Sequence, residues 1–281
     1  MITAPVPVAG GAPRREGGSG VAKVIIALRD VCLEYRNDET GIAHQAVVGL
    51  NLDVREGEFL CVVGPSGCGK STVISAIAGF LHPVRGSLEM NGQPIRKPGA
   101  DRGVVFQEYA LLPWLRVIDN VAFGLKMRGI PKAERHATAR RYLELTNLAQ
   151  AADKFPHELS GGMKQRAAVA RTLANAPTVM LMDEPFAAID AQTRMSLQEE
   201  LLRICADSTV TVVFVTHSVE EAVFLGDRVV VFSPGPGTVR AEVEVPIPRA
   251  ARRWAAMNAD PAFNALREKV MQLVRSKQDM H

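Results

Sequence analysis

Short apolar runs alternate with polar turns along most of this chain, and their spacing predicts alternating strands and helices. Strands are expected at residues 25–28, 31–35, 46–54, 59–63, 86–90, 103–107, 178–183, 209–216 and 228–233. Helices are expected at residues 73–78, 119–127, 131–147, 163–173, 193–206 and 219–225, and from Asp260 onward with Phe263, Leu266, Val270, Leu273 and Val274 on one face. This alternation favours an α/β fold with a parallel sheet covered by helices on both faces.

The pattern also divides the chain. Residues 1–23 are rich in proline, glycine and alanine, so we expect a disordered tail. Residues 24–257 are expected to form the main domain. Strand signals vanish between about 108 and 176, which predicts an α-helical subdomain there. Residues 258–281 are expected to add a C-terminal helical extension.

A glycine-rich stretch between the strand at 59–63 and the helix at 73–78 predicts a polyphosphate site. It follows the pattern G-x-x-x-x-G-K-[ST] and consists of Gly64, Pro65, Ser66, Gly67, Cys68, Gly69, Lys70, Ser71 and Thr72. Its glycines allow backbone N–H groups to approach phosphate, and the helix N-terminus adds partial positive charge. Lys70 is expected to reach the β- and γ-phosphate oxygens, and Ser71 to ligand Mg²⁺.

Two further segments fit phosphate chemistry. Asp183 and Glu184 end an apolar strand, where Asp183 can hold Mg²⁺ and Glu184 can orient or deprotonate an attacking water. The segment 159–166 contains Ser160, Gly161 and Gly162 before a helix, which predicts a second anion-ready helix start.

Composition restricts the partners and the compartment. The chain has 281 residues and a net charge of +3, too small to indicate nucleic acid or an anionic membrane surface as a partner. The four cysteines, Cys32, Cys61, Cys68 and Cys205, form no C-x-x-C pair, so we expect a reducing compartment without disulfides or zinc. We expect no signal peptide and no membrane-spanning segment, and therefore a cytosolic protein.

Cys68 is a separate hypothesis because it lies inside the phosphate loop. The helix N-terminus and Lys70 would stabilise its thiolate, so it is expected to react first with a maleimide and to be protected by Mg-ATP. The alternative is that Cys68 is a small residue filling a tight loop.

The segment from Leu159 to Arg166 resembles the signature motif of ATP-binding cassette (ABC) ATPases, and the resemblance covers about residues 25–240. By this resemblance, Tyr35 matches the aromatic that stacks on adenine and Gln107 the lid glutamine that senses Mg²⁺ and water. Asp190 lies in the matching D-loop, and His217 matches the switch histidine that contacts the γ-phosphate. Met163-Lys164 and Ala187-Ala188-Ile189 depart mildly from the usual motifs but leave Ser160, Gly161, Gly162 and Asp190 in place.

The resemblance implies a phosphate-loop NTPase with a parallel sheet, an antiparallel β subdomain and an α-helical subdomain. It implies ATP and Mg²⁺ as cofactors and a head-to-tail dimer in which the signature motif of a second copy closes over the γ-phosphate. It also implies transmembrane permease subunits as partners at the cytoplasmic face of the membrane, supplied by a periplasmic or extracellular substrate-binding protein. Glu184, His217, Gln107 and Lys70 would be the catalytic residues.

Within the family, residues 98–107, 111–114, 119–125 and 233–237 are similar to the taurine, sulfonate and nitrate importer branch, with taurine importer ATPases as the nearest likeness. Three other interpretations compete with this one: a soluble ABC ATPase acting on DNA repair or ribosomes, an exporter's nucleotide-binding part, and a small-molecule kinase. The chain has neither a long coiled-coil insertion nor membrane helices, and the signature motif argues against a kinase. Leu111, Leu112, Trp114 and Leu115 look exposed and are expected to touch the permease, with simple packing as the alternative.

Overall fold

The computed structural model describes residues 23–36, 43–206 and 209–275, so the predicted disordered tail lies outside the described residues apart from Lys23. The elements are β1 (Val24–Arg36), β2 (Ala43–Arg55), β3 (Phe59–Val63), α1 (Lys70–Ala78), β4 (Arg85–Met90), β5 (Gln93–Pro94), β6 (Arg102–Val105), α2 (Val117–Val121), α3 (Phe123–Met127), α4 (Lys132–Leu145), α5 (Gly161–Ala174), β7 (Val179–Asp183), α6 (Ala191–Ala206), β8 (Thr211–Thr216), α7 (Val219–Leu225), β9 (Arg228–Phe232), β10 (Val239–Glu244), α8 (Trp254–Met257) and α9 (Pro261–Arg275). Short 3₁₀ turns lie at residues 149–151, 156–158 and 249–251.

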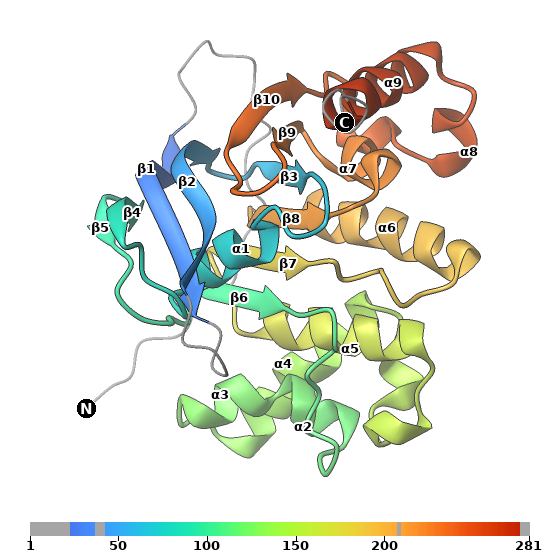
Figure 1. Ribbon diagram of the computed structural model, residues 1–281. Coiled ribbons are helices and arrows are strands. Elements are labelled where there is room, and N and C mark those ends of the chain that lie inside the picture. Colours follow the sequence, from blue (N-terminus) through green and yellow to red (C-terminus); the bar gives the residue numbers. More distant parts are fainter. Residues whose placement is uncertain (1–22, 37–42, 207–208, 276–281) are drawn as a thin grey trace.

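The larger sheet has six strands in the order β10-β9-β3-β8-β7-β6 (Figure 1). All neighbours are parallel except the edge pair of β9 and β10. Strands β3, β8 and β9 are buried along their whole length, which explains their unbroken apolar sequences. Because Val63 of β3 pairs with Thr216 of β8, and Asp183 of β7 pairs with Val215 of β8, the strands β3, β7 and β8 end at one edge of the sheet.

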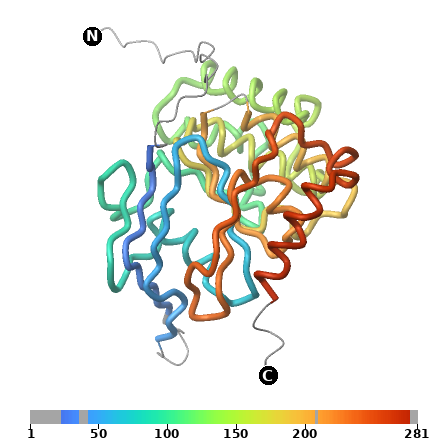
Figure 2. Tube along the Cα trace, turned by 90° about the horizontal axis from the view of Figure 1, so that it is seen from above, coloured from blue at the N-terminus to red at the C-terminus, as the bar shows by residue number. Residues whose placement is uncertain are grey.

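A second, antiparallel sheet has the strand order β2-β1-β4-β5, and α1 packs between the two sheets (Figure 1). Seen from above, β1 and β2 lie on one side of the molecule and α9 on the other, with β9 and β10 between them (Figure 2). One apolar cluster fills the space between the sheets and includes Leu28, Leu50, Ile77 and Val213. The phosphate loop, which leads into α1, therefore lies between the two sheets.

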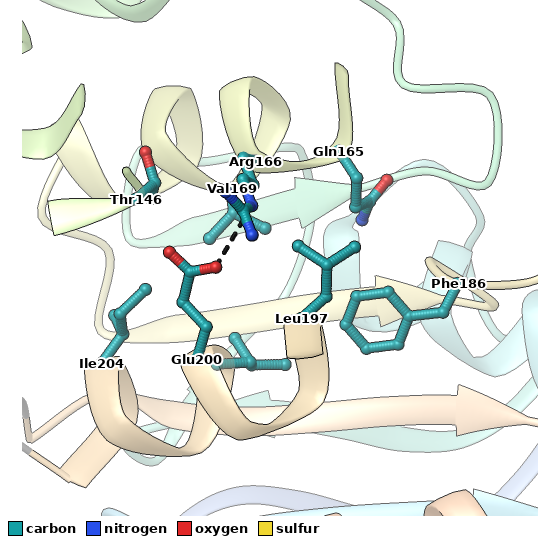
Figure 3. Close-up of a pocket in the computed structure, with 9 residues that line it drawn as sticks. Thr146, Gln165, Arg166, Val169, Phe186, Leu197, Glu200 and Ile204 are labelled. Atoms are coloured by element: carbon teal, nitrogen blue, oxygen red, sulfur yellow. Dashed lines mark ion pairs between the residues drawn. The ribbon is translucent and has the colours of Figure 1, made fainter. Parts of the chain in front are cut away.

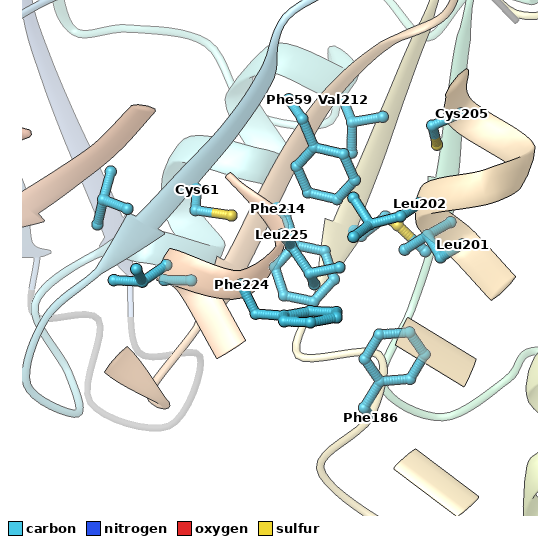
Figure 4. Packing of buried hydrophobic residues seen from close by; sticks show 14 of the residues in the cluster. Phe59, Cys61, Phe186, Leu201, Leu202, Cys205, Val212, Phe214, Phe224 and Leu225 are labelled. Atoms are coloured by element: carbon cyan, nitrogen blue, oxygen red, sulfur yellow. The ribbon is translucent and has the colours of Figure 1, made fainter. Parts of the chain in front are cut away.

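The opposite face of the larger sheet is covered by α6, α7 and α9. Its core includes Phe59, Phe186 and Phe214, and the ring centroid of Phe214 lies 5.8 Å from that of each of the other two (Figure 4). Helices α2 to α5 gather around a separate apolar cluster. A distinct helical group between β6 and β7 agrees with the predicted helical insert.

The main departures from the expected elements lie in β1, in α2 and α3, and in β10. Residues 25–35 form one strand rather than two, because an irregularity around Asp30, whose φ is 50°, absorbs the polar interruption. The helix expected at 119–127 is broken at Ala122 into α2 and α3. Strand β10 was not predicted, because its sequence is mostly polar and only Val243 is buried.

The C-terminal helix begins where Asp260 was expected to cap it, since Oδ1 of Asp260 accepts hydrogen bonds from the N–H groups of Ala262 and Phe263. Phe263 and Val270 are fully buried against the same core as α7. Among the described helices, none is both long and apolar enough to cross a bilayer.

Candidate nucleotide-binding site

The phosphate loop joins β3 to α1, as predicted. Gly67 and Gly69 have φ values of 75° and 91°, a region that glycine enters without steric cost. A Cβ on Gly69 would lie 2.6 Å from the carbonyl oxygen of Ala46 on β2, so the loop is tightly seated on the neighbouring strand. The geometry therefore requires glycine there on two grounds, backbone angle and space.

Lys70 begins α1 and is only 5% exposed. Its Nζ donates hydrogen bonds of 2.9 Å to the carbonyl oxygens of Gly64 and Pro65. The Lys70 ammonium group therefore contacts the backbone of the same loop that the motif predicts to bind phosphate. A buried cation beside glycine-rich backbone and a helix N-terminus fits a polyanionic ligand.

Ser71 and Asp183 come together from α1 and β7. The Ser71 hydroxyl donates to Oδ1 of Asp183 at 2.9 Å. Burial raises the pKa of the Asp183 carboxyl, and the Glu184 charge adds to this, while the Ser71 bond and the Lys70 charge oppose it.

This donor set fits Mg²⁺ shared with a triphosphate. Mg²⁺ commonly takes one or two protein carboxylates and completes its shell with water and phosphate oxygens. In the described part of the chain, no cluster of three or more His, Cys, Asp or Glu side chains could hold a metal ion by itself, without water or phosphate ligands. Asp183 and Ser71, beside the phosphate loop, supply the protein's share of the ligands.

Glu184 and His217 meet at the ends of neighbouring strands. Nδ1 of His217 lies 3.0 Å from Oε2 of Glu184. Glu184 has a φ of 43°, rare for a non-glycine residue, and its backbone N–H donates to the carbonyl of Val215 at 2.9 Å. Such strain is typical of functional positions, because only the surrounding structure can hold a residue there.

Tyr35 and Gln107 are both exposed, Tyr35 at 53%. The strand expected at 103–107 ends at Val105, which leaves Gln107 in the following loop. The Tyr35 ring stacks on His44 with centroids 5.4 Å apart. Sequence reasoning missed His44, although pairing of β1 with β2 places it directly opposite Tyr35 and could have revealed it.

The signature segment forms the capped helix start that was predicted. Oγ of Ser160 accepts a hydrogen bond from the N–H of Met163, and α5 begins at Gly161. A Cβ on Gly162 would lie 2.7 Å from Thr193 of α6, so Gly162 allows close helix packing.

Asp190 is exposed and caps α6. Its Oδ1 accepts from the N–H of Thr193 at 3.0 Å, and such bonds lower the pKa of Asp190. The structure therefore gives Asp190 a local capping role in addition to the predicted position in the D-loop.

A small cavity lies between α5 and α6 (Figure 3). Arg166 pairs with Glu200 across it at 3.2 Å, and Asn147 donates to Glu200 at 2.9 Å. Both polar atoms of the buried Gln165 amide lack a protein hydrogen-bond partner. The space open to the centre of a water-sized sphere is about 20 Å³, enough for one water molecule.

The expectation that the surroundings of Cys68 stabilise an accessible thiolate is wrong. Cys68 is fully buried, and a Cβ on Gly64 would lie 2.9 Å from its Sγ, so the thiol fills space beneath the loop. Burial raises the pKa of the thiol, and the Lys70 charge offsets this only partly. The curvature of the loop, which sequence spacing does not encode, turns the side chain inward.

We expect all four thiols to react slowly with a maleimide in the folded protein, roughly tenfold or more below the denatured chain, because each is buried. Cys32, at 6%, is the most exposed of the four and should be labelled first. Mass spectrometry of labelled peptides, with Cys32→Ser as the control, measures this order. Rapid labelling of Cys68 that Mg-ATP prevents would contradict the buried placement.

Comparison with known proteins identifies the family. The family model described as ABC transporter matches residues 47–187. An uncharacterized ABC transporter ATP-binding protein of Methanocaldococcus jannaschii is 48% identical over 83% of this chain and 85% of its own length. The taurine import ATP-binding protein TauB of Chromobacterium violaceum is also 48% identical, over 82% of this chain and 90% of its own length.

Two further relatives extend the comparison. The bicarbonate transport ATP-binding protein CmpC of Synechococcus elongatus is 46% identical over 82% of this chain, which spans only 35% of that relative. A solved dimeric ATP-binding cassette, in a post-hydrolysis state bound to ADP and Pi, matches with a TM-score of 0.70 and 30% identity over 80% of this chain and all of that one. The predicted fold class is confirmed, and the chain belongs to the ABC transporter family as an ATP-binding cassette, an ATPase whose cofactors are ATP and Mg²⁺.

Proposed function

We propose that this cassette is the ATP-hydrolysing subunit of an importer for a small anion, with taurine or another aliphatic sulfonate favoured and nitrate as an alternative. Two copies would sandwich two ATP molecules head to tail and drive a membrane permease from the cytoplasmic face. A substrate-binding protein on the other side would deliver the anion.

The observation that supports the catalytic part is the meeting of five side chains at one edge of the larger sheet. Lys70 and Ser71 begin the helix after β3, Asp183 and Glu184 lie at the end of β7, and His217 follows β8. The parallel register of these three strands aligns their carboxyl ends, where the Ser71–Asp183 and Glu184–His217 pairs form. A triphosphate site needs a cation, a Mg²⁺ ligand and a group that handles water, and this edge offers all three.

Each residue has a proposed role. Lys70 and the loop N–H groups bind the phosphates, and Ser71 and Asp183 hold Mg²⁺, which would neutralise phosphate charge when bound. Glu184 orients or deprotonates water, and His217 contacts the γ-phosphate and holds the Glu184 carboxylate in place.

The remaining residues contact the nucleotide from its periphery. Tyr35, together with His44, would stack on adenine, since the two rings already form one exposed platform. Gln107 would close over the metal site. Ser160, Gly161, Gly162 and Asp190 would act across the dimer interface.

The dimer is supported by the solved cassette, which is dimeric and bound to ADP and Pi. A closed dimer held through the γ-phosphate would open after hydrolysis, because ADP lacks the bridging group. The nucleotide then shifts the equilibrium by its different affinity for the open and closed states.

Anion import is supported by the relatives, one named for taurine import and another for bicarbonate transport. The test is to isolate the cassette with its permease from membranes, identify the binding protein, and titrate the latter with taurine, other sulfonates, nitrate and bicarbonate. We expect saturable binding of one of these anions. A cassette that isolates without any membrane protein would contradict the proposal.

The same preparation tests where the permease docks. Trp114 is 71% exposed, whereas Leu111, Leu112 and Leu115 are half-buried, which narrows the predicted contact to the tryptophan. We expect Trp114→Ala to leave basal ATPase of the isolated cassette intact and to cut stimulation in the complex by roughly tenfold, as loss of a buried aromatic contact would. Equal loss in both preparations would instead indicate damaged folding.

A further inference from the structure

The chain beyond β9 turns back over α7, the helix that begins two residues after His217 (Figure 1). Trp254 of α8 is 6% exposed and stacks on Phe224 of α7, with ring centroids 4.0 Å apart and planes 8° from parallel. Its ring also meets the edge of Phe263 of α9. The C-terminal segment, which contains α8 and α9, therefore packs directly against α7, the helix that follows His217.

A chain of hydrogen bonds runs from this tryptophan toward the site. The indole N–H of Trp254 donates to Oε1 of Gln198 at 3.0 Å, and Nε2 of Gln198 donates to Oε1 of Glu221 at 2.6 Å. The second oxygen of Glu221 accepts from the Thr216 hydroxyl. All four side chains belong to residues no more than 6% exposed, and Gln198, Glu221 and Trp254 line an open cleft at the surface.

The Thr216 end of this series of hydrogen bonds holds Thr216 and Ser218, the two residues that flank His217. The N–H of Ser218 donates to Oγ1 of Thr216 at 3.0 Å, and Oγ of Ser218 accepts from the N–H of Glu221. His217 lies between these two residues, with its Nδ1 3.0 Å from Glu184. The position of Glu221 thus fixes the short loop that carries the imidazole.

The tryptophan also decides which way Gln198 faces. An indole N–H can only donate, so the amide oxygen of Gln198 must face it and the amide NH₂ must face Glu221. The reverse orientation would set the amide oxygen against the carboxylate and leave the indole N–H unpaired, both costly in a buried place.

Other groups hold the same helix. The Arg252 guanidinium is 1% exposed and donates to the carbonyls of Phe224 and Gly226, at the end of α7. Burial raises the pKa of the Glu221 carboxyl, and the hydrogen bonds from Thr216 and Gln198 and the charge of Arg194 oppose this rise. The C-terminal segment therefore anchors α7 at both ends.

We propose that Trp254 and Gln198 are positioning residues for His217: through Glu221 and Thr216 they hold the loop 216–218 so that the imidazole meets Glu184. The residues beyond β10 are then part of the catalytic apparatus although they touch no nucleotide. This inference rests on the proposed role of His217.

The test is Trp254→Phe, which keeps the stacked ring but removes the indole N–H. We expect kcat for ATP to fall roughly tenfold, with KM for Mg-ATP changed less than about twofold, because the nucleotide contacts stay in place. The NMR signal of the His217 imidazole, identified as the one missing in His217→Ala, should shift. Lys269→Ala, an exposed change on α9, should alter neither readout.

A purely structural role for Trp254 would lower the melting temperature without moving the His217 signal, and that result would overturn the proposal. Unchanged kcat in Trp254→Phe, with His217→Ala inactive, would overturn it while leaving the role of His217 intact. Full turnover in His217→Ala would overturn both. If Trp254→Phe does not fold, Gln198→Met breaks the same link from the other side and is judged by the same two readouts.

Discussion

ATP hydrolysis should fall by about two orders of magnitude or more in Glu184→Gln, while ATP binding survives. The change is isosteric and removes the carboxylate that orients or deprotonates water. The amide can still pair with His217, which lies 3.0 Å away in the native protein, so the surrounding geometry should persist. We also expect an ATP-held dimer to accumulate, because the closed state is no longer released by hydrolysis.

Steady-state turnover and light scattering in the presence of Mg-ATP measure the two effects. Glu134→Gln, the same chemical change at an exposed position of α4, should behave as the native protein. Near-normal turnover in Glu184→Gln would exclude Glu184 as the catalytic base. Loss of ATP binding would show instead that the carboxylate is needed to maintain the loop that carries it, whose backbone is strained at a φ of 43°.

The residues that could be predicted from sequence are those whose neighbours in the chain define their place. Lys70 and Ser71 follow from the spacing of a strand, a glycine loop and a helix, and Asp183 and Glu184 from the end of an apolar strand. Pairings across strands carry no such local sign. His44 meets Tyr35 only because β1 and β2 are antiparallel neighbours, and this register was not predicted.

The direction in which side chains point inside the phosphate loop also could not be predicted from the sequence. Cys68 was placed correctly in the loop but expected on its phosphate side, whereas the left-handed turn at Gly67 and Gly69 directs the thiol inward. Strand β10 escaped prediction for a different reason. As an antiparallel edge strand it has one buried apolar residue, Val243, so its pattern resembles that of a polar loop.

Gly237 shows what such long-range packing contributes to the site. It follows β9 in the loop 233–237, which packs against both β2 and the phosphate loop. Gly237 exchanges backbone hydrogen bonds with β2, donating to Ala46 at 2.8 Å and accepting from Val48 at 3.1 Å. A Cβ at Gly237 would lie only 1.9 Å from the carbonyl oxygen of Cys68.

We expect Gly237→Ala to lower kcat/KM for Mg-ATP by roughly a hundredfold. Relief of the clash requires the phosphate loop or the 233–237 loop to move by about 1 Å, and a misplacement of that size at a catalytic site has effects of this order. Because the obstructing atom belongs to the backbone, no side-chain rotation can remove the clash. Most of the loss should appear as weaker nucleotide binding, measured by equilibrium titration with a fluorescent ATP analogue.

Gly235→Ala is the matched control two residues away, since its Cβ would meet only the carbonyl oxygen of Gly67 at 3.4 Å, an ordinary contact distance. Neither glycine has a positive φ, so the comparison isolates packing against the phosphate loop from backbone strain. Equal activity of the two variants would mean that the loop after β9 yields freely and does not support the phosphate loop. A selective loss of nucleotide affinity in Gly237→Ala, at unchanged secondary structure, would establish that this loop, which begins 161 residues after Thr72, helps to shape the phosphate site.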